Sequence, residues 1–229
     1  MPDPRTPSLT SPEQLVDLSH TVAHGLVTYK GLPAPIICDY LSREASRKHY
    51  APGTEFHIGK IEMVANTGTY LDSPFHRYAD GKDLSQLELQ KLANLPAVKV
   101  QAQNQQAIDV SCFPREANLR GKAILIETEW SRHWNTPQYF EGHPFLTEDA
   151  ARFLANAGVA LVGIDSYNID DVQDLRRPVH SILLKNEIPI VEHMTNLSAL
   201  PNSDFKFFAV PVKVKDFGTF PVRAFAIVE

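Results

Sequence analysis

The chain has 229 residues, of which 43% are hydrophobic and 21% are charged. This ordinary globular composition excludes a disordered chain, a coiled coil and a collagen-like fibre, and the length accommodates one large domain or two small ones. With 22 basic residues, 27 acidic residues and no dense basic run, the sequence lacks the electrostatic footprint of a nucleic-acid-binding protein.

The two cysteines, Cys38 and Cys112, lie far apart and outside any CxxC pattern, which suits a reducing compartment. No apolar run approaches the ~18 residues of a membrane-spanning helix. The first residues also lack the apolar core of a signal peptide. We therefore expect a cytoplasmic protein that acts on a small molecule and binds neither nucleic acid nor membranes.

Strand patterns dominate the first half of the chain. Residues 1–14 are expected to form a proline-rich arm that is loose or docks on a partner subunit, followed by one domain over residues 15–229. Strands are predicted over residues 15–20, 58–64, 96–100 and 123–126. Two irregular segments, residues 28–35 and the aromatic stretch 130–144, are predicted to be surface loops.

Helices and strands alternate in the second half. Thr147 is a good N-cap and Gly158 a good helix stop, so a helix is predicted between them. A second helix is predicted from Pro178 to near Asn186. Strands are predicted over residues 159–164, 188–191, 207–214 and 222–228. These elements indicate a single α/β domain in which helices flank a mixed sheet or open barrel.

Residues 66–76 carry the most informative pattern, Asn-Thr-Gly-Thr-Tyr-Leu-Asp-Ser-Pro-Phe-His. Alternate side chains of an extended chain point to one face, so Asn66, Tyr70, Asp72 and His76 are expected to face together. A carboxylate and an imidazole on one side of a loop shaped by Gly and Pro are typical of a functional site. The same residues also suit a plain turn with a capping Asp72 and a surface His76.

A second group of candidates follows the predicted strands of the second half. Glu192 and Asp165 each come directly after a strand, and His180 lies near a helix N-terminus. Ligand-binding groups of α/β folds gather beyond the carboxyl ends of strands. Taken alone, these residues favour a structural interpretation: a half-buried histidine, a glutamate at the rim of the sheet and a turn aspartate.

The stretch from Asn66 to His76 resembles the signature of the cyclase family, which contains kynurenine formamidases and isatin hydrolases and reads His-x-Gly-Thr-His-x-Asp-x-Pro-x-His. Five positions match in register: Gly68, Thr69, Asp72, Pro74 and His76. Further similarity to the family lies in Asp17-Leu18-Ser19, Gly31, Gly163-Ile164-Asp165 and the segment 180–192. The resemblance spans most of the chain from about residue 15.

The resemblance implies a swivelling β/β/α fold and a metal-dependent hydrolase that opens amide or lactam bonds of small aromatic substrates. It also implies that two histidines and the aspartate of the signature bind metal. The last signature histidine, here His76, would act in catalysis. A later histidine and glutamate, here His180 and Glu192, would complete a second metal position.

This sequence departs from the signature at two metal-ligand positions, because Asn66 and Tyr70 replace histidines. An amide oxygen is a weak metal donor, and a phenol is a poor one unless the metal deprotonates it. Asp72, His180 and Glu192 remain, and three protein ligands can hold one divalent metal, here zinc or manganese. We expect Tyr29, Asn66, Tyr70 and Phe75 to contact the substrate.

Three hypotheses of function follow. The first is a hydrolase of an amide, lactam or lactone bond, with at most one divalent metal and His76 as the proton shuttle. The second is a metal-free enzyme that uses His76 as a general base in the same pocket. The third is a non-catalytic small-molecule-binding protein on the same fold. In each case the resemblance and the proline-rich arm favour a homo-oligomer, a dimer or a tetramer.

Overall fold

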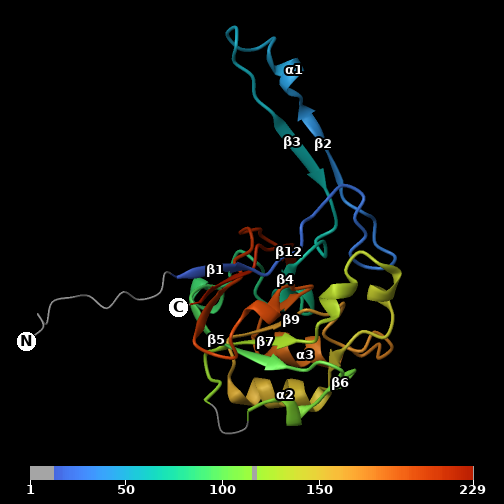
Figure 1. Ribbon diagram of the computed structural model, residues 1–229, viewed down its shortest axis with the longest axis vertical. Helices are drawn as coiled ribbons and strands as arrows, with labels where there is room; N and C mark the ends of the chain where they lie inside the picture. The colour runs from blue at the N-terminus through green and yellow to red at the C-terminus, as the bar shows by residue number, and fades with distance from the viewer. Residues whose placement is uncertain (1–12, 115–117, 229) are drawn as a thin grey trace, which may run out of the picture.

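The computed structural model describes residues 13–114 and 118–228. Its strands in the main sheet are β1 (Gln14–Asp17), β4 (Tyr70–Asp72), β5 (Leu95–Gln101), β7 (Ala123–Glu127), β9 (Leu161–Ile164), β10 (Ile190–Glu192), β11 (Phe205–Phe208), β12 (Thr219–Pro221) and β13 (Phe225–Val228). They form one nine-stranded sheet in the order β1-β13-β11-β5-β7-β9-β10-β4-β12 (Figure 1). The central strands β5, β7, β9 and β10 run parallel, and the outer ones pair antiparallel.

Two helices cover one face of this sheet, α2 (Glu148–Ala157) and α3 (Pro178–Lys185). In α2 the Thr147 hydroxyl accepts a 3.2 Å hydrogen bond from the Ala150 amide, and Gly158 ends the helix with a φ of 69°. Pro178 begins α3, where the missing N–H of proline leaves no helical bond unmade. Both helices are where the sequence predicts them.

The parallel strands are buried on both faces, which explains their continuous apolar runs. Leu125 and Leu161 point into one core cluster. Ile124 and Val162, their neighbours in sequence, point into the cluster beneath α2 and α3. The predicted α/β domain with a mixed sheet flanked by helices is therefore confirmed.

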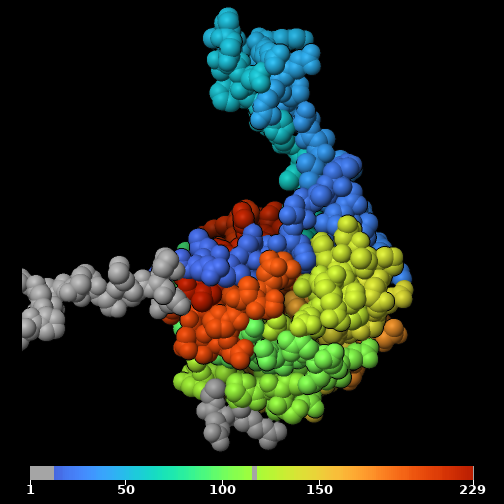
Figure 2. Space-filling view, viewed as in Figure 1, coloured from blue at the N-terminus to red at the C-terminus, as the bar shows by residue number. Residues whose placement is uncertain are grey.

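A hairpin that the sequence pattern did not reveal stands away from this body. It pairs β2 (Ile36–Leu41) with β3 (Ile58–Glu62) in a separate sheet, with the short helix α1 (Arg43–Ser46) near its tip. Figures 1 and 2 show it projecting from the sheet domain. The strand predicted over residues 58–64 corresponds to β3, whereas β2 was not predicted, because most of its side chains are exposed.

Short elements complete the chain: β6 (Ala107–Ile108), β8 (Phe145–Leu146) and the 3₁₀ turns Pro74–His76, Leu89–Lys91, Val110–Cys112, Trp130–His133, Pro137–Phe140 and Leu197–Ala199. Among the described residues, none of the helices combines the length and apolarity needed to cross a bilayer. The proposed arm over residues 1–14 lies almost wholly outside the described residues, although Gln14 already belongs to β1.

Four sequence predictions need correction. The segment 66–76 is not all loop, because Tyr70–Asp72 pairs with two neighbouring strands as β4. The strand predicted over 207–214 ends at Phe208, and the strand predicted over 222–228 is restricted to β13. The segment 130–144 is irregular as predicted but is not confined to the surface, since Tyr139 and His143 are buried in it.

Candidate active site

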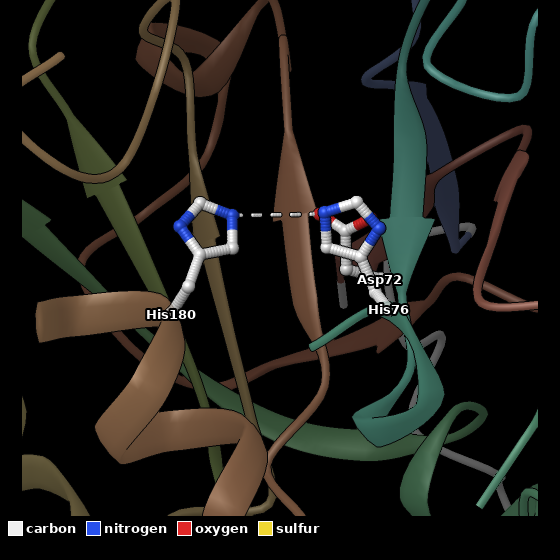
Figure 3. A group of neighbouring side chains, drawn as sticks. All are labelled: Asp72, His76 and His180. Atoms are coloured by element: carbon white, nitrogen blue, oxygen red, sulfur yellow. Dashed lines mark ion pairs between the residues drawn. The ribbon is translucent and has the colours of Figure 1, made fainter. Parts of the chain in front are cut away.

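Side chains from four segments converge beside the carboxyl end of β10. The register of the antiparallel pair β10–β4 places Glu192 opposite Tyr70, and Asp72 ends β4 two residues later. His180 comes from the first turn of α3, and His76 ends the 3₁₀ turn that follows β4. In Figure 3 the His180 ring faces the carboxylate of Asp72, which overlaps the His76 ring in this view.

Asp72, His76 and His180 each offer a ligand atom, and these atoms lie within 4.8 Å of one another. The Nε2 atom of His180 is 3.7 Å from Oδ2 of Asp72 and 3.8 Å from Oε1 of Glu192. The Nδ1 atom of His76 is 3.6 Å from Oδ1 of Asp72. The structure thus brings together all four residues for which the sequence predicts catalysis or metal binding.

Asp170, a residue that sequence reasoning missed, fixes the orientation of His180. Its Oδ2 accepts a 2.6 Å hydrogen bond from Nδ1 of His180, so Nε2 is the atom turned toward Asp72. The same carboxylate accepts the backbone amides of Val179 and His180 and so caps α3. A buried carboxylate behind a histidine is the usual support of a metal-ligating or catalytic imidazole.

Thr219 of β12, also missed, fixes the proton of His76. Its hydroxyl donates to Oδ1 of Asp72, and the same oxygen lies 2.8 Å from Nδ1 of His76. A hydroxyl has one hydrogen to donate, and here the Asp72 carboxylate accepts that hydrogen bond. In the neutral imidazole, Nδ1 of His76 therefore carries the hydrogen that reaches Thr219, and Nε2 keeps a lone pair.

The buried charges influence one another strongly. Burial disfavours a charged His180, but Glu192, the hydrogen bond to Asp170 and Asp72 together raise its pKa to about 10. Burial also disfavours an ionised Asp72, yet His76, His180 and the Thr219 hydroxyl hold the pKa of that carboxyl below its usual value. Burial raises the pKa of Glu192 to about 7. The site therefore couples an ionised Asp72 to a strongly basic His180.

Tyr70 occupies one of the two positions where the sequence departs from the family signature, and it is only 1% exposed. Its hydroxyl donates a 2.7 Å hydrogen bond to Oε2 of Glu192. Burial and the nearby Glu192 and Asp72 charges raise the pKa of the phenol well above its usual value, although a hydrogen bond from Asn66 opposes this. Tyr70 is therefore a neutral hydrogen-bond donor rather than a phenolate ligand.

A pocket of about 250 Å³ opens onto these groups. Three of the predicted substrate-binding residues line it, namely Tyr29, Asn66 and Tyr70, and Tyr29 stacks on Tyr167 with ring centroids 4.8 Å apart. Phe75 lines a neighbouring depression instead. The pocket also has polar lining residues that the sequence did not suggest: Arg77, Asn168 and Arg177.

Asp165 does not line this pocket. Its carboxylate accepts hydrogen bonds from the Thr128 amide, the Thr128 hydroxyl and the Glu129 amide. It therefore fixes the turn after β7, which is the structural role left open by the sequence.

The residues present fit a divalent cation. Oδ2 of Asp72 is fully buried and has no hydrogen-bond partner among the described residues. This oxygen faces Nε2 of His180. The other ring nitrogen of His180, Nδ1, is hydrogen-bonded to Asp170 on the opposite side of the ring. An unpartnered carboxylate oxygen and an imidazole nitrogen facing one another are a suitable donor pair for zinc or manganese.

Comparison with known proteins shows the family of the chain. Residues 16–171 match the family described as "Putative cyclase". The kynurenine formamidase of Bacillus cereus strain ATCC 14579 is 30% identical over 212 residues, which cover 91% of this chain and 95% of that protein. The kynurenine formamidase of Bacillus cytotoxicus is 31% identical over 169 residues, 73% of this chain and 78% of that one.

Solved structures share the fold. Isatin hydrolase A from Ralstonia solanacearum superposes with a TM-score of 0.79 at 20% identity, covering 95% of this chain and 92% of that one. A structure described as a potential metal-dependent hydrolase with cyclase activity gives a TM-score of 0.78 at 22% identity, with 95% and 98% covered. With the family match over residues 16–171 and full-length relatives at 30% identity, the chain belongs to the cyclase family.

Proposed function

We propose that this protein is a hydrolase that opens an amide, lactam or lactone bond of a small aromatic or cyclic substrate. The observation that carries the proposal is the position of His76, whose Nδ1 lies 2.8 Å from the Thr219 hydroxyl oxygen, at a pocket whose inner end is formed by Asp72, His180 and Glu192. Relatives named kynurenine formamidase agree with hydrolysis of an amide bond in a small aromatic molecule.

His76 is suited to move the proton. Nε2 of His76 takes a proton from the attacking water as the water oxygen bonds to the carbonyl carbon. His76 then gives that proton to the departing nitrogen or oxygen as the carbon–heteroatom bond breaks. Thr219 and Asp72 hold the ring in place through Nδ1 and stabilise the positive charge that it carries in between.

Asp72 and His180 would hold a divalent cation, and either His76 or Glu192 would complete the set. When bound, such a cation supplies Lewis acidity, which polarises the carbonyl and acidifies water toward a pKa of ~7. The assignment of Glu192 as the third ligand, favoured by the sequence, leaves His76 free for proton transfer. In the alternative, His76 is the third ligand. The ligand atoms of Asp72, His76 and His180 lie within 4.8 Å of one another.

The substrate would lie against Tyr29 and the edge of Tyr70. Tyr29 is half-buried and backed by Tyr167, so its ring has a fixed face on which an aromatic substrate can stack. The Asn66 amide is in a position to hydrogen-bond the substrate carbonyl. Phe75 would act on the pocket only through His76, its neighbour in the chain.

A metal-free enzyme is the second candidate, and one observation favours it. Both carboxylate oxygens of Glu192 already have hydrogen-bond donors, the Ile169 amide at 2.6 Å and the Tyr70 hydroxyl at 2.7 Å. Because these two donors occupy the carboxylate oxygens, Glu192 is a weaker ligand for a cation. In that case His76 would act as the general base alone, with Asp72 as its orienting partner.

Elemental analysis together with an activity assay separates these candidates. The purified protein is tested against aryl formamides and small lactams before and after chelation, and again after zinc or manganese is added back. Up to one equivalent of metal per chain, with activity lost on chelation and restored by the metal, supports the first candidate. Undiminished activity without metal supports the second, and no turnover of any such substrate contradicts both.

We also propose that the protein is a homo-oligomer that acts in the cytoplasm. The hairpin of β2 and β3 exposes Ile36, Tyr40, Phe56 and Ile61, and an isolated two-stranded hairpin is marginally stable in water. A second subunit against these side chains would stabilise it. Light scattering of the parent protein and of the double variant Tyr40→Ser with Ile61→Ser tests the oligomeric state. The two free cysteines suit a reducing compartment such as the cytoplasm.

A further inference from the structure

A second depression, of about 250 Å³, borders His76, the proposed proton shuttle. His76 and Asn66 line both this depression and the main pocket, so the two cavities meet at these side chains. Thr219, which lies on the Nδ1 side of the His76 ring, lines the depression, whereas His180 lines the main pocket. The imidazole therefore separates two cavities, of which the proposed hydrolysis uses only one.

The walls of this depression are largely apolar. Phe75 and Phe217 contribute aromatic rings, and Ala65 contributes a single methyl group. The Phe217 side chain is 39% exposed, so a ligand that covers it gains from the removal of apolar surface from water. Asp216 contributes an exposed carboxylate, which disfavours an anionic ligand. These walls therefore suit a neutral apolar group.

The wall formed by residues 216–218 is held against the turn that carries His76. Its backbone makes hydrogen bonds with the Asp83 carboxylate and with the Ser73 amide, each at 2.7 Å. A Cβ atom on Gly218 would lie 2.6 Å from Cα of His76, so only glycine allows this close approach. The wall is thus fixed before a ligand arrives, and binding against it costs little ordering of the protein.

A hydrolysable amide has two parts, one on each side of the scissile bond, and two cavities meet here at the residue that transfers the proton. The proposed function places the aromatic part in the main pocket, against Tyr29 and Tyr70. The carbonyl carbon then lies beside His76, and an acyl chain that continues from this carbon enters the depression between His76 and Asn66. A formyl group ends at its hydrogen and would leave this space empty.

We propose that this depression is an acyl subsite, and that the preferred substrates are aromatic amides whose acyl group is a neutral apolar chain of several carbons. The inference rests on the proposed hydrolysis, for which it defines the substrate class. The water oxygen bonds to the carbonyl carbon while His76 takes a proton from that water. The carbon–nitrogen bond then breaks, and the nitrogen receives the proton from His76. The products are the free aromatic amine and the carboxylic acid that carries the chain.

Equilibrium binding tests the subsite without turnover. Calorimetry compares 1-phenyl-2-propanone with 1-phenyl-2-pentanone, ketones in which a CH₂ group replaces the amide NH, so neither can be hydrolysed. The pentanone has two more methylene groups on the acyl side, and we expect it to bind about tenfold more tightly, as burial of these groups implies. Ala65→Leu, which fills the depression, and Phe217→Ala, which removes one wall, should each abolish most of this preference. Val212→Ala, which removes an exposed apolar side chain of the same segment outside the depression, should retain it.

Turnover separates this inference from the proposed function. Formanilide, acetanilide, propionanilide and butyranilide are compared, and each rate is divided by the rate of alkaline hydrolysis to remove differences in intrinsic reactivity. We expect the corrected kcat/KM of the parent protein to rise about two- to fourfold with each added carbon. The series should become flat or fall in Ala65→Leu and Phe217→Ala, and it should keep the parental slope in Val212→Ala.

Hydrolysis of formanilide with no gain from longer chains, together with equal affinities for the two ketones, would overturn the inference and leave the hydrolase standing. Tighter binding of the pentanone that is lost in Ala65→Leu and Phe217→Ala, without turnover of any anilide, would contradict the hydrolase and retain the apolar subsite. A preference for longer chains that survives in both variants would place the acyl chain elsewhere and also overturn the inference.

Discussion

The Asp170 carboxylate accepts a 2.6 Å hydrogen bond from Nδ1 of His180 while it caps the helix that carries this histidine. One buried side chain therefore sets both where α3 begins and which nitrogen of His180 faces Asp72. The position of the ring and its protonation are coupled through this contact, so a change at residue 170 should alter the site without a large change in the fold.

Asp170→Asn should lower activity or metal affinity about 10–100-fold, as is typical when the support of a ligating histidine is removed. The new amide oxygen can still cap α3, but it carries no charge to hold the His180 proton. The expected result is a lower pKa of His180 and a pH–rate profile that shifts with it. Asp171→Asn, next in sequence and outside this contact, is the control. A profile that does not move in Asp170→Asn would reduce Asp170 to a helix cap.

His76→Ala should reduce turnover by ~10²–10⁴ if His76 transfers the proton, because this is the usual loss for a positioned acid or base. Its metal content should stay at the parental value, since Asp72, His180 and Glu192 remain. Elemental analysis of the variant measures this directly. Loss of both metal and activity would instead assign His76 as a ligand, in the group with Asp72 and His180.

The contribution of the buried histidines His143 and His193 to the stability of the protein should become unfavourable between pH 6.5 and pH 4. Burial lowers the pKa of His193 to about 3 and that of His143 to about 4, so both rings stay neutral in the folded protein. The unfolded chain takes up these protons below pH 6.5, which favours unfolding. At pH 5 the loss amounts to about 2 kcal/mol of unfolding free energy for each buried histidine.

Urea denaturation at several pH values measures this dependence, and His143→Leu provides a sharp comparison. Both ring nitrogens of His143 are buried without a hydrogen-bond partner among the described residues, so an apolar side chain of similar size is tolerated there. The variant should lose less stability between pH 7 and pH 5 than the parent. His49→Gln, on the exposed hairpin, should leave the parental slope unchanged, and an equal slope in His143→Leu would contradict the prediction.

The parts of the site that the sequence could predict are those close together in the chain. Period-two alternation correctly placed Tyr70 and Asp72 on one face, because β4 is a true extended strand. Glu192 lies at the carboxyl end of a strand, and His180 lies near a helix N-terminus that begins with a proline, as the sequence predicts. The central strands and both longer helices follow from hydrophobic runs and caps.

The missing parts depend on long-range contacts. Thr219 reaches Asp72 across 147 residues of sequence, and the pairing of β12 with β4 that brings them together leaves no local pattern. The strand over Ile36–Leu41 was missed because most of its side chains are exposed on both faces, so alternation is absent. Asp170 looks like an ordinary loop aspartate until α3 folds back onto it.

The double variant Asn66→His with Tyr70→His should bind more zinc or manganese than the parent protein. Gly68, with a φ of 69°, keeps the loop in shape, and Asp72 remains at the end of β4, so only the donors at 66 and 70 change. Two imidazoles and a carboxylate form a strong ligand set for either metal. Replacing Tyr70 also removes the hydroxyl that donates to Glu192, which frees one carboxylate oxygen.

Calorimetry measures the gain in bound metal, and each single variant should gain less because two strong ligands leave the metal largely hydrated. Tyr70→Ala is the control that opens the same space without a donor. An equal gain in Tyr70→Ala would mean that the phenol only blocks a competent site. If neither variant gains metal, positions 66 and 70 do not point toward Asp72 closely enough to share an ion.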